Sequence, residues 1–189
     1  MHEITIGVAI AALAAAGATA AFASEHGERE EHGEHRGRRE RERRERQAPA
    51  PADAEARALY RKECGACHLD FPPGFLPAES HRRIMAGLER HFGQDAELEP
   101  EVRGRIERWL VDNAAEAGTS RKSRKMLGSI QGEPPLRITE VPYFRRKHRE
   151  VGARVVARPS VRSLANCAAC HPGARDWDFD DDRAKIPAG

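Results

Sequence analysis

Large apolar side chains are scarce in this 189-residue chain. Two Trp, two Tyr and six Phe are all the aromatic residues, 5% of the sequence, whereas charged residues make up 33%. A small domain buries too little apolar surface to offset its chain entropy easily. A core made of protein side chains alone would therefore be marginal.

Strand patterns and excess charge are also missing. No segment alternates apolar and polar residues over a useful length, so the sequence predicts a mostly α fold with long irregular connections. The formal net charge is only +2, and basic residues are not interleaved with aromatic ones in a patch. Nucleic acid is therefore not an expected partner.

One long apolar run exists, at residues 4–23, and it ends in the small-x-small sites Ala18-Thr19-Ala20 and Ala21-Phe22-Ala23. These features predict a signal peptide over residues 1–23, cleaved after Ala23, and export to the periplasm. No Lys or Arg precedes the run. An uncleaved anchor is the alternative, and only then do we expect membrane attachment, since ~20 apolar residues span a bilayer.

Residues 24–52 are predicted to be a disordered charged segment followed by a Pro/Ala linker. The part at 24–46 has eight Glu, eight Arg, three His and no aliphatic or aromatic residue, so nothing there can be buried. We favour a soluble spacer, although His26, His32 and His35 could bind copper, nickel or zinc. The folded domain is expected at 53–189.

Helices are predicted within this domain from capping residues and apolar stripes. We expect a loop at 119–137 because it is basic and rich in Gly and Pro. The expected helices are 54–68 after Asp53, 81–92 after Ser80, 101–118 after Pro100, 140–150 after Thr139, and 161–171 after Ser160.

The motif C-x-x-C-H occurs twice, as Cys64, Cys67 and His68 and as Cys167, Cys170 and His171. Positions i, i+3 and i+4 share one face of a helix, so both thiols can bond to a porphyrin while the imidazole reaches its iron. A redox dithiol lacks the expected βαβ context, and zinc ligands usually come from separated segments. The motifs predict two haem c groups, whose flat apolar surfaces would enlarge the core.

The second axial ligand of each iron is not evident from the motifs. No His or Met follows His171, so the second haem takes its other ligand from upstream or leaves that position open. The upstream candidates are His81, His91, His148, Met85 and Met126, with a lysine as the less favoured choice. Of these, His81 is expected to be exposed, Met85 to lie in the core and Met126 in a loop.

Four blocks in order resemble the dihaem cytochrome c family known as DHC: "ECGACH" with "FPPGFLP", "IMAGLERHFGQDAEL", "RITEVPYFRRKHRE" and the C-terminal C-x-x-C-H. The resemblance covers about residues 57–189. It implies two low-spin, low-potential bis-histidine haems, with proximal ligands His68 and His171 and distal ligands His91 and His148. We assign His91 to haem 1 and His148 to haem 2, although the sequence also allows the reverse pairing.

By the same resemblance the protein is a periplasmic electron carrier without catalytic residues, and we expect a monomer. Its expected partner is a redox protein, either a monohaem oxygen-binding cytochrome c or a membrane cytochrome. A haem enzyme or gas sensor with one open iron position is the alternative, as is a small dihaem subunit of a larger reductase.

Two further features bear on this function. Arg145, Arg146, Lys147 and Arg149 could steer an acidic partner, pair with haem propionates, or form an ordinary solvated face. In the last eighteen residues, Trp177, Phe179 and Ile186 are expected to cover porphyrin.

Overall fold

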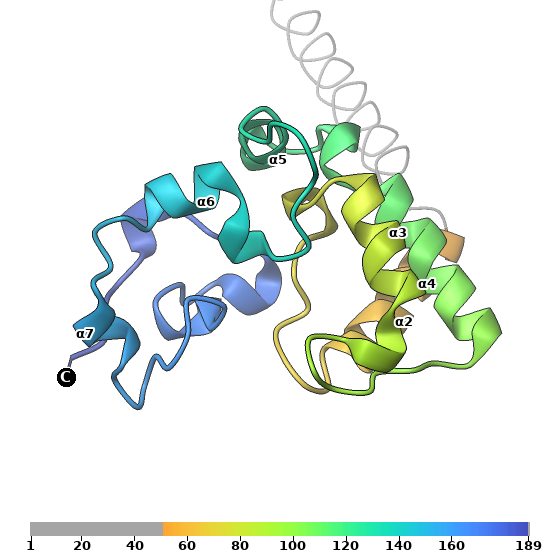
Figure 1. Cartoon of the computed structure of the whole chain (residues 1–189), viewed down its shortest axis with the longest axis horizontal. Coiled ribbons are helices and arrows are strands. Elements are labelled where there is room, and N and C mark those ends of the chain that lie inside the picture. The colour runs from red at the N-terminus through yellow and green to blue at the C-terminus, as the bar shows by residue number, and fades with distance from the viewer. Residues whose placement is uncertain (1–50, 189) are drawn as a thin grey trace, which may run out of the picture. The chain divides into compact units, whose positions relative to one another are not determined.

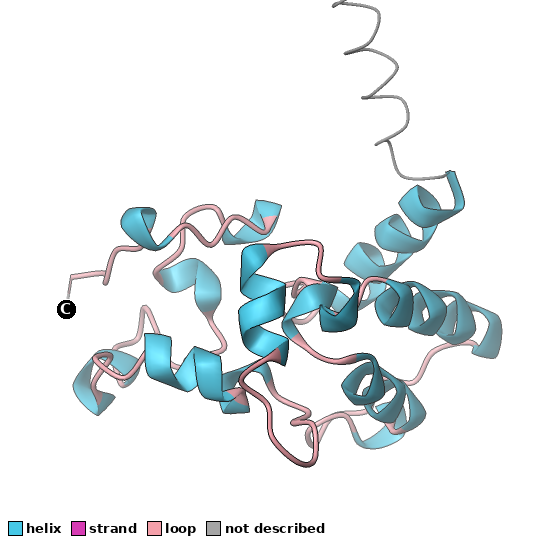
Figure 2. Cartoon of the chain, turned by 90° about the horizontal axis from the view of Figure 1, so that it is seen from above, coloured by secondary structure: helices cyan, strands magenta, loops and turns pink. Residues whose placement is uncertain are grey.

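The computed structural model describes residues 51–188, and every regular element in that range is a helix (Figures 1 and 2). The mostly α fold is confirmed. The signal peptide or anchor and the charged segment with its three histidines lie outside the described residues. Within 51–188, no helix combines the length and hydropathy needed to cross a bilayer.

Three helices form the first half of the domain: α2 (Pro51–Cys64), α3 (Ala78–Ala86) and α4 (Pro100–Asp112) (Figure 1). Their apolar faces meet in one cluster, in which the rings of Tyr60 and Trp109 are 5.3 Å apart. The buried members of this cluster are Ala56, Tyr60, Met85, Leu88, Ile106, Trp109 and Leu110.

Shorter elements form the second half. These are α5 (Arg121–Leu127), α6 (Pro142–Lys147), α7 (Ala153–Val156) and several 3-10 turns. A second cluster buries Leu76, Met126, Val141, Tyr143 and Phe144. The two clusters are continuous, because Ile84 packs against both.

The prediction of a loop over 119–137 is wrong, because α5 lies within it. The Ser120 hydroxyl accepts a hydrogen bond from the Ser123 N–H, which caps the helix. Met126 consequently lies in the core, 4% exposed, and not in a loop.

The helix predicted at 161–171 is also absent, and only the 3-10 turn Cys167–Ala169 forms there. The backbone of Arg162 has a positive φ of 63°. The Asn166 amide donates to the Val161 carbonyl, and the Ser163 hydroxyl accepts from the Ala165 N–H. These side chains offer the backbone alternatives to helical bonding.

The expectation that His81 is exposed is wrong as well. The residue is 7% exposed, and its Nε2 donates a 2.8 Å hydrogen bond to the Pro73 carbonyl. Desolvation lowers the pKa of His81. His81 therefore fastens α3 to the segment that follows the first C-x-x-C-H motif.

Candidate haem sites

The first motif begins at the last residue of α2, Cys64. The next N–H, that of Gly65, donates to the Arg61 carbonyl at 3.1 Å and closes the final turn. A side-chain carbon at position 65 would lie only 2.2 Å from that carbonyl oxygen. Glycine is therefore required for the turn that carries the chain from Cys64 to Cys67.

The second motif forms one isolated turn. The N–H groups of Cys170 and His171 both donate to the Cys167 carbonyl, at 3.2 and 2.8 Å. The second of these is an α-helical bond, so a single turn still gathers the two thiols and the imidazole. A full helix is not needed for the motif geometry.

All four cysteines are unpaired. Burial, the main cause, raises the pKa of the Cys64 and Cys167 thiols to about 11. A redox-active C-x-x-C cysteine has a lowered pKa, because the thiolate is its reactive form. The thiols of Cys64 and Cys167 thus differ from those of a dithiol redox centre.

The imidazoles of His68 and His91 face one another with ring centres 6.2 Å apart and planes inclined by 20°. His68 Nδ1 lies 2.6 Å from the Leu69 carbonyl, and Phe71 stacks on the ring at 5.1 Å. His91 ends the 3-10 turn Leu88–Arg90. Burial lowers its pKa, and His68 and Arg137 lower it further.

The imidazoles of His148 and His171 are also 6.2 Å apart, but their planes are inclined by 66°. His148 caps α6, and its Nδ1 lies 3.0 Å from the Phe144 carbonyl. The Phe144 ring stacks on it at 3.9 Å, and Phe179 meets His171 edge-on at 5.6 Å. Burial, followed by His148, lowers the pKa of His171.

These spacings fit one metal ion between each pair. Imidazole nitrogens bind metals at about 2 Å, so two rings on opposite sides of one ion have centres roughly 6 Å apart. The lowered pKa values of His91 and His171 favour the neutral imidazole, which is the metal-binding form. Both pairs therefore have the spacing that ligation of one haem iron requires, and the lowered pKa of His91 and of His171 favours the metal-binding form of one histidine in each pair.

Comparisons with known proteins agree with this geometry. The model of the family described as dihaem cytochrome c matches residues 60–179. This chain belongs to the dihaem cytochrome c family.

Two solved structures are similar to it. One is a diheme cytochrome c from Rhodobacter sphaeroides, with 47% identity and a TM-score of 0.57 over 65% of this chain and 95% of that one. Another is the diheme cytochrome type c from Shewanella baltica OS155, with 39% identity and a TM-score of 0.59 over 70% and 94%. The comparison with curated proteins finds no match.

Membership of the family means that the chain carries two c-type haems and is an electron-transfer haem protein. The geometry places His91 beside His68 and His148 beside His171. That each pair ligates one haem iron stays a prediction. Met85 and Met126 lie buried in the two apolar clusters.

The C-terminal residues of this dihaem cytochrome contact both halves of the domain. Trp177 packs on Trp109, and its indole N–H donates to the Asp70 carbonyl at 2.6 Å. Phe179 is buried against His171, whereas Ile186 is 53% exposed and is not buried by the protein. Of the three predicted cover residues, only Phe179 contacts a motif histidine.

Sequence reasoning missed an ion cluster beside the second site. Asp181 accepts bonds from Lys122 at 2.9 Å and Lys147 at 2.6 Å. The two lysines lower the pKa of the Asp181 carboxyl to about 2. The three residues are far apart in the chain, so no local pattern could reveal this cluster.

Proposed function

We propose that this dihaem cytochrome is a periplasmic electron carrier whose two haems are both bis-histidine and low-spin. The thioether bonds would come from Cys64 and Cys67 for haem 1 and from Cys167 and Cys170 for haem 2. The axial pairs would be His68 with His91 and His148 with His171.

The matched 6.2 Å spacing of the two imidazole pairs carries this proposal. A bound haem supplies a one-electron Fe(III)/Fe(II) couple. Two histidines per iron leave no position for a substrate or a gas, and they hold the potential below that of His/Met ligation. The side chains around each pair then have one task, which is to hold the rings in place in both oxidation states.

One short segment links the two sites. Phe71 stacks on His68, while Phe75 contacts Phe179 at 5.1 Å, and Phe179 contacts His171. Four residues of chain span at most about 14 Å. Phe71 at the first imidazole pair and Phe75 at the second therefore lie within this distance of each other along the backbone. Such proximity of the two sites supports electron exchange between the haems.

Export and partner choice complete the proposal. The apolar run at 4–23 with its small-x-small sites supports secretion to the periplasm, where c-type cytochromes operate. The partner we propose is another redox protein, a monohaem c-type cytochrome or a membrane cytochrome.

Electron paramagnetic resonance of the oxidised holoprotein tests the ligation. We expect two low-spin ferric signals and no high-spin signal, and no spectral change when carbon monoxide is added to the reduced protein. A high-spin signal from one haem in the native protein would overturn the bis-histidine assignment and favour an open-haem enzyme or sensor.

Single substitutions assign the ligands. His148→Ala and His91→Ala should each convert one of the two haems to a high-spin, carbon monoxide-binding form. His81→Gln is the matched control, because His81 contacts the Pro73 carbonyl and neither imidazole pair. If His148→Ala left both haems low-spin with unchanged potentials, His148 would not be a ligand.

A further inference from the structure

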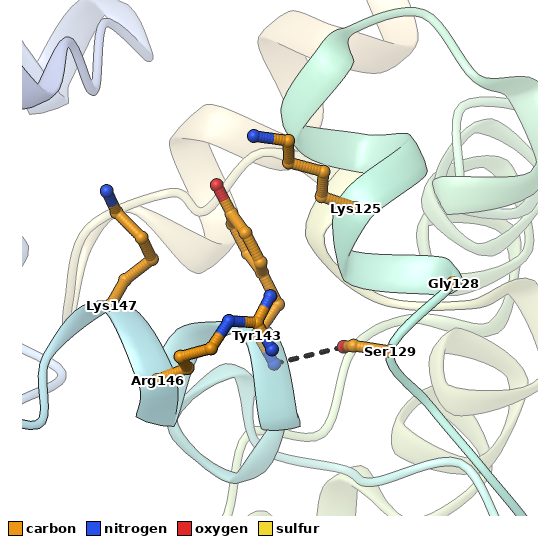
Figure 3. Close-up of a pocket in the computed structure, with 6 residues that line it drawn as sticks. All are labelled: Lys125, Gly128, Ser129, Tyr143, Arg146 and Lys147. Carbon is orange, nitrogen blue, oxygen red and sulfur yellow. Dashed lines mark hydrogen bonds between the residues drawn. The ribbon is translucent and has the colours of Figure 1, made fainter.

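A hollow of about 500 Å³ opens between α5 and α6 (Figure 3). Lys125 on α5 and Arg146 and Lys147 on α6 contribute its charged groups, and Tyr143 lies between them. Gly128 and Ser129 complete the lining. We call these six residues the cationic hollow.

The two segments that flank the cationic hollow are basic, although one of its three lining cations, Lys147, is paired with Asp181. Residues 121–127 and 142–149 contain no Asp or Glu. Within the described part of the chain, neither Lys125 nor Arg146 forms an ion pair with a carboxylate. The exposed cations of these two segments are Arg121, Arg124, Lys125, Arg145, Arg146, Lys147 and Arg149.

Tyr143 holds two of the cations apart and in place. The Lys125 ammonium lies 5.6 Å and the Arg146 guanidinium 5.0 Å from the centre of its ring. The ring is itself fixed, because Tyr143 is 9% exposed and its backbone N–H donates to the Ser129 hydroxyl at 3.0 Å. Cation–π contacts of this kind orient a charge without neutralising it.

The cationic hollow adjoins the second imidazole pair. Lys147 immediately precedes His148, and it shares Asp181 with Lys122. A partner seated on the hollow would therefore lie beside the haem 2 site.

The hollow near the first imidazole pair differs. It measures about 460 Å³ and is lined by both signs of charge. Arg83 pairs with Glu133 at 2.9 Å, and Arg137 pairs with Glu140 at 3.8 Å. An approaching charged protein meets little net field there, so the two haem sites present different electrostatic surfaces.

We propose that the cationic hollow is the docking surface for an acidic redox protein that exchanges electrons with haem 2. The proposal rests on the electron-carrier function proposed above. Complementary charge raises the encounter rate and sets the orientation, while unpaired rim cations leave the complex weak enough to dissociate after each electron. Haem 1 would then exchange electrons with the outside only through haem 2 or by a second surface.

Stopped-flow reduction of the oxidised holoprotein by a reduced plant-type [2Fe–2S] ferredoxin, an acidic one-electron donor, tests the proposal. Each event takes one electron from the cluster and reduces one ferric haem to the ferrous state. We expect the second-order rate constant to fall steeply as salt is added. The double variant Lys125→Glu/Arg146→Glu should be at least about tenfold slower at low salt, and should approach the native rate at high salt.

Arg90→Glu is the matched control, because Arg90 is exposed and lies next to His91 in the chain, at the other site. It should change the rate by less than about twofold. Equal rates for the control and the double variant would overturn the docking surface.

Haem spectra and potentials distinguish docking from a role in pairing with the haem propionates. If the double variant shifted the potential or spectrum of haem 2, these cations would serve the haem propionates, and the docking assignment would fall. A failure of bis-histidine ligation shows in the paramagnetic resonance spectrum of the native protein. That result is independent of the ferredoxin rates, so the two proposals fail separately.

Discussion

The two imidazole pairs have the same spacing on different scaffolds. In the first half, α2, α3 and α4 enclose a cluster that contains Trp109 and Tyr60. In the second half, short helices and 3-10 turns enclose a smaller cluster. Both imidazole pairs nevertheless have ring centres 6.2 Å apart. This spacing of a histidine pair is thus compatible with either regular helices or isolated turns.

The two imidazole pairs differ in the angle between their ring planes. They are inclined by 20° in the first pair and by 66° in the second. Each orientation follows from local contacts, with Leu69 and Phe71 beside His68, and Phe144 beside His148. If both haems are ligated by two histidines, as proposed above, we therefore expect them to be electronically distinct.

The largest expected effect comes from Trp109→Ala in the first half. Trp109 is 6% exposed and contacts Tyr60 and Trp177, so its truncation should lower the free energy of unfolding by about 3–5 kcal/mol. Because Ile84 joins both clusters, both halves should unfold in one transition. Denaturant unfolding, followed by circular dichroism and by the haem absorption, measures this. Separate transitions would show that the halves are independent.

Gly65→Ala should have a smaller but still clear effect, confined to the first site. The added carbon meets the Arg61 carbonyl oxygen at 2.2 Å, so the α2 terminus must shift. Overpacking of this kind costs about 1–3 kcal/mol. Ala168→Gly at the second motif is the counterpart and should cost no more than about 1 kcal/mol.

Gly65→Ala and Ala168→Gly are compared by their covalent haem content and their unfolding midpoints. Loss of haem 1 attachment in Gly65→Ala alone is the expected result. Equal effects at the two motifs would mean that α2 does not constrain the first turn.

The sequence predicts best those features that depend on residues close together in the chain. The apolar stripe in the predicted helix 101–118 located α4, which ends earlier, at Asp112, and the C-x-x-C-H spacing located both haem motifs. The histidine pairs followed from the family resemblance. Local patterns failed where side chains compete with the backbone, as Asn166 does in the segment expected to be helical.

Long-range geometry was beyond the sequence for a different reason. The burial of His81 depends on the 3-10 turn Pro73–Phe75, and the Asp181 cluster joins residues up to 59 positions apart. The inclination of two imidazoles depends on contacts from several elements. Contacts of this kind produce no periodic pattern of residues in the sequence, so they could not be predicted from it.

Phe144→Leu tests the origin of the crossed planes. Leu is smaller than Phe but keeps an apolar side chain in this buried position, so the fold should persist. Removing the 3.9 Å stack leaves the His148 ring held by its Nδ1 contact with the backbone carbonyl of residue 144, and should alter only the more anisotropic low-spin signal, which we assign to haem 2. Phe71→Leu is the matched change at His68 and should alter only the other signal. Identical signals from both haems in the native protein would contradict the inference from the ring planes.

The smallest effect belongs to Asp181, which ties the C-terminal residues to α5 and α6. Lys147 and Lys122 depress the pKa of its carboxyl to about 2 in the folded protein, against about 3.9 in an unfolded chain. The stabilisation is therefore complete above about pH 4–5 and is lost as the pH falls toward 2. The side chain is 48% exposed, so the two ion pairs together contribute no more than about 1 kcal/mol.

Asp181→Asn measures this contribution by difference. At pH 6 the native protein should be more stable than the variant by that amount at low salt, and by less in 1 M salt. At pH 2 the difference between the two unfolding midpoints should be much smaller, because about half of the native carboxyl groups are then protonated. A difference that stayed constant from pH 6 to pH 2 would show that Asp181 acts through packing or neutral hydrogen bonds. The C-terminal residues would then be held to the second half by uncharged contacts, as Trp177 is held to the first half.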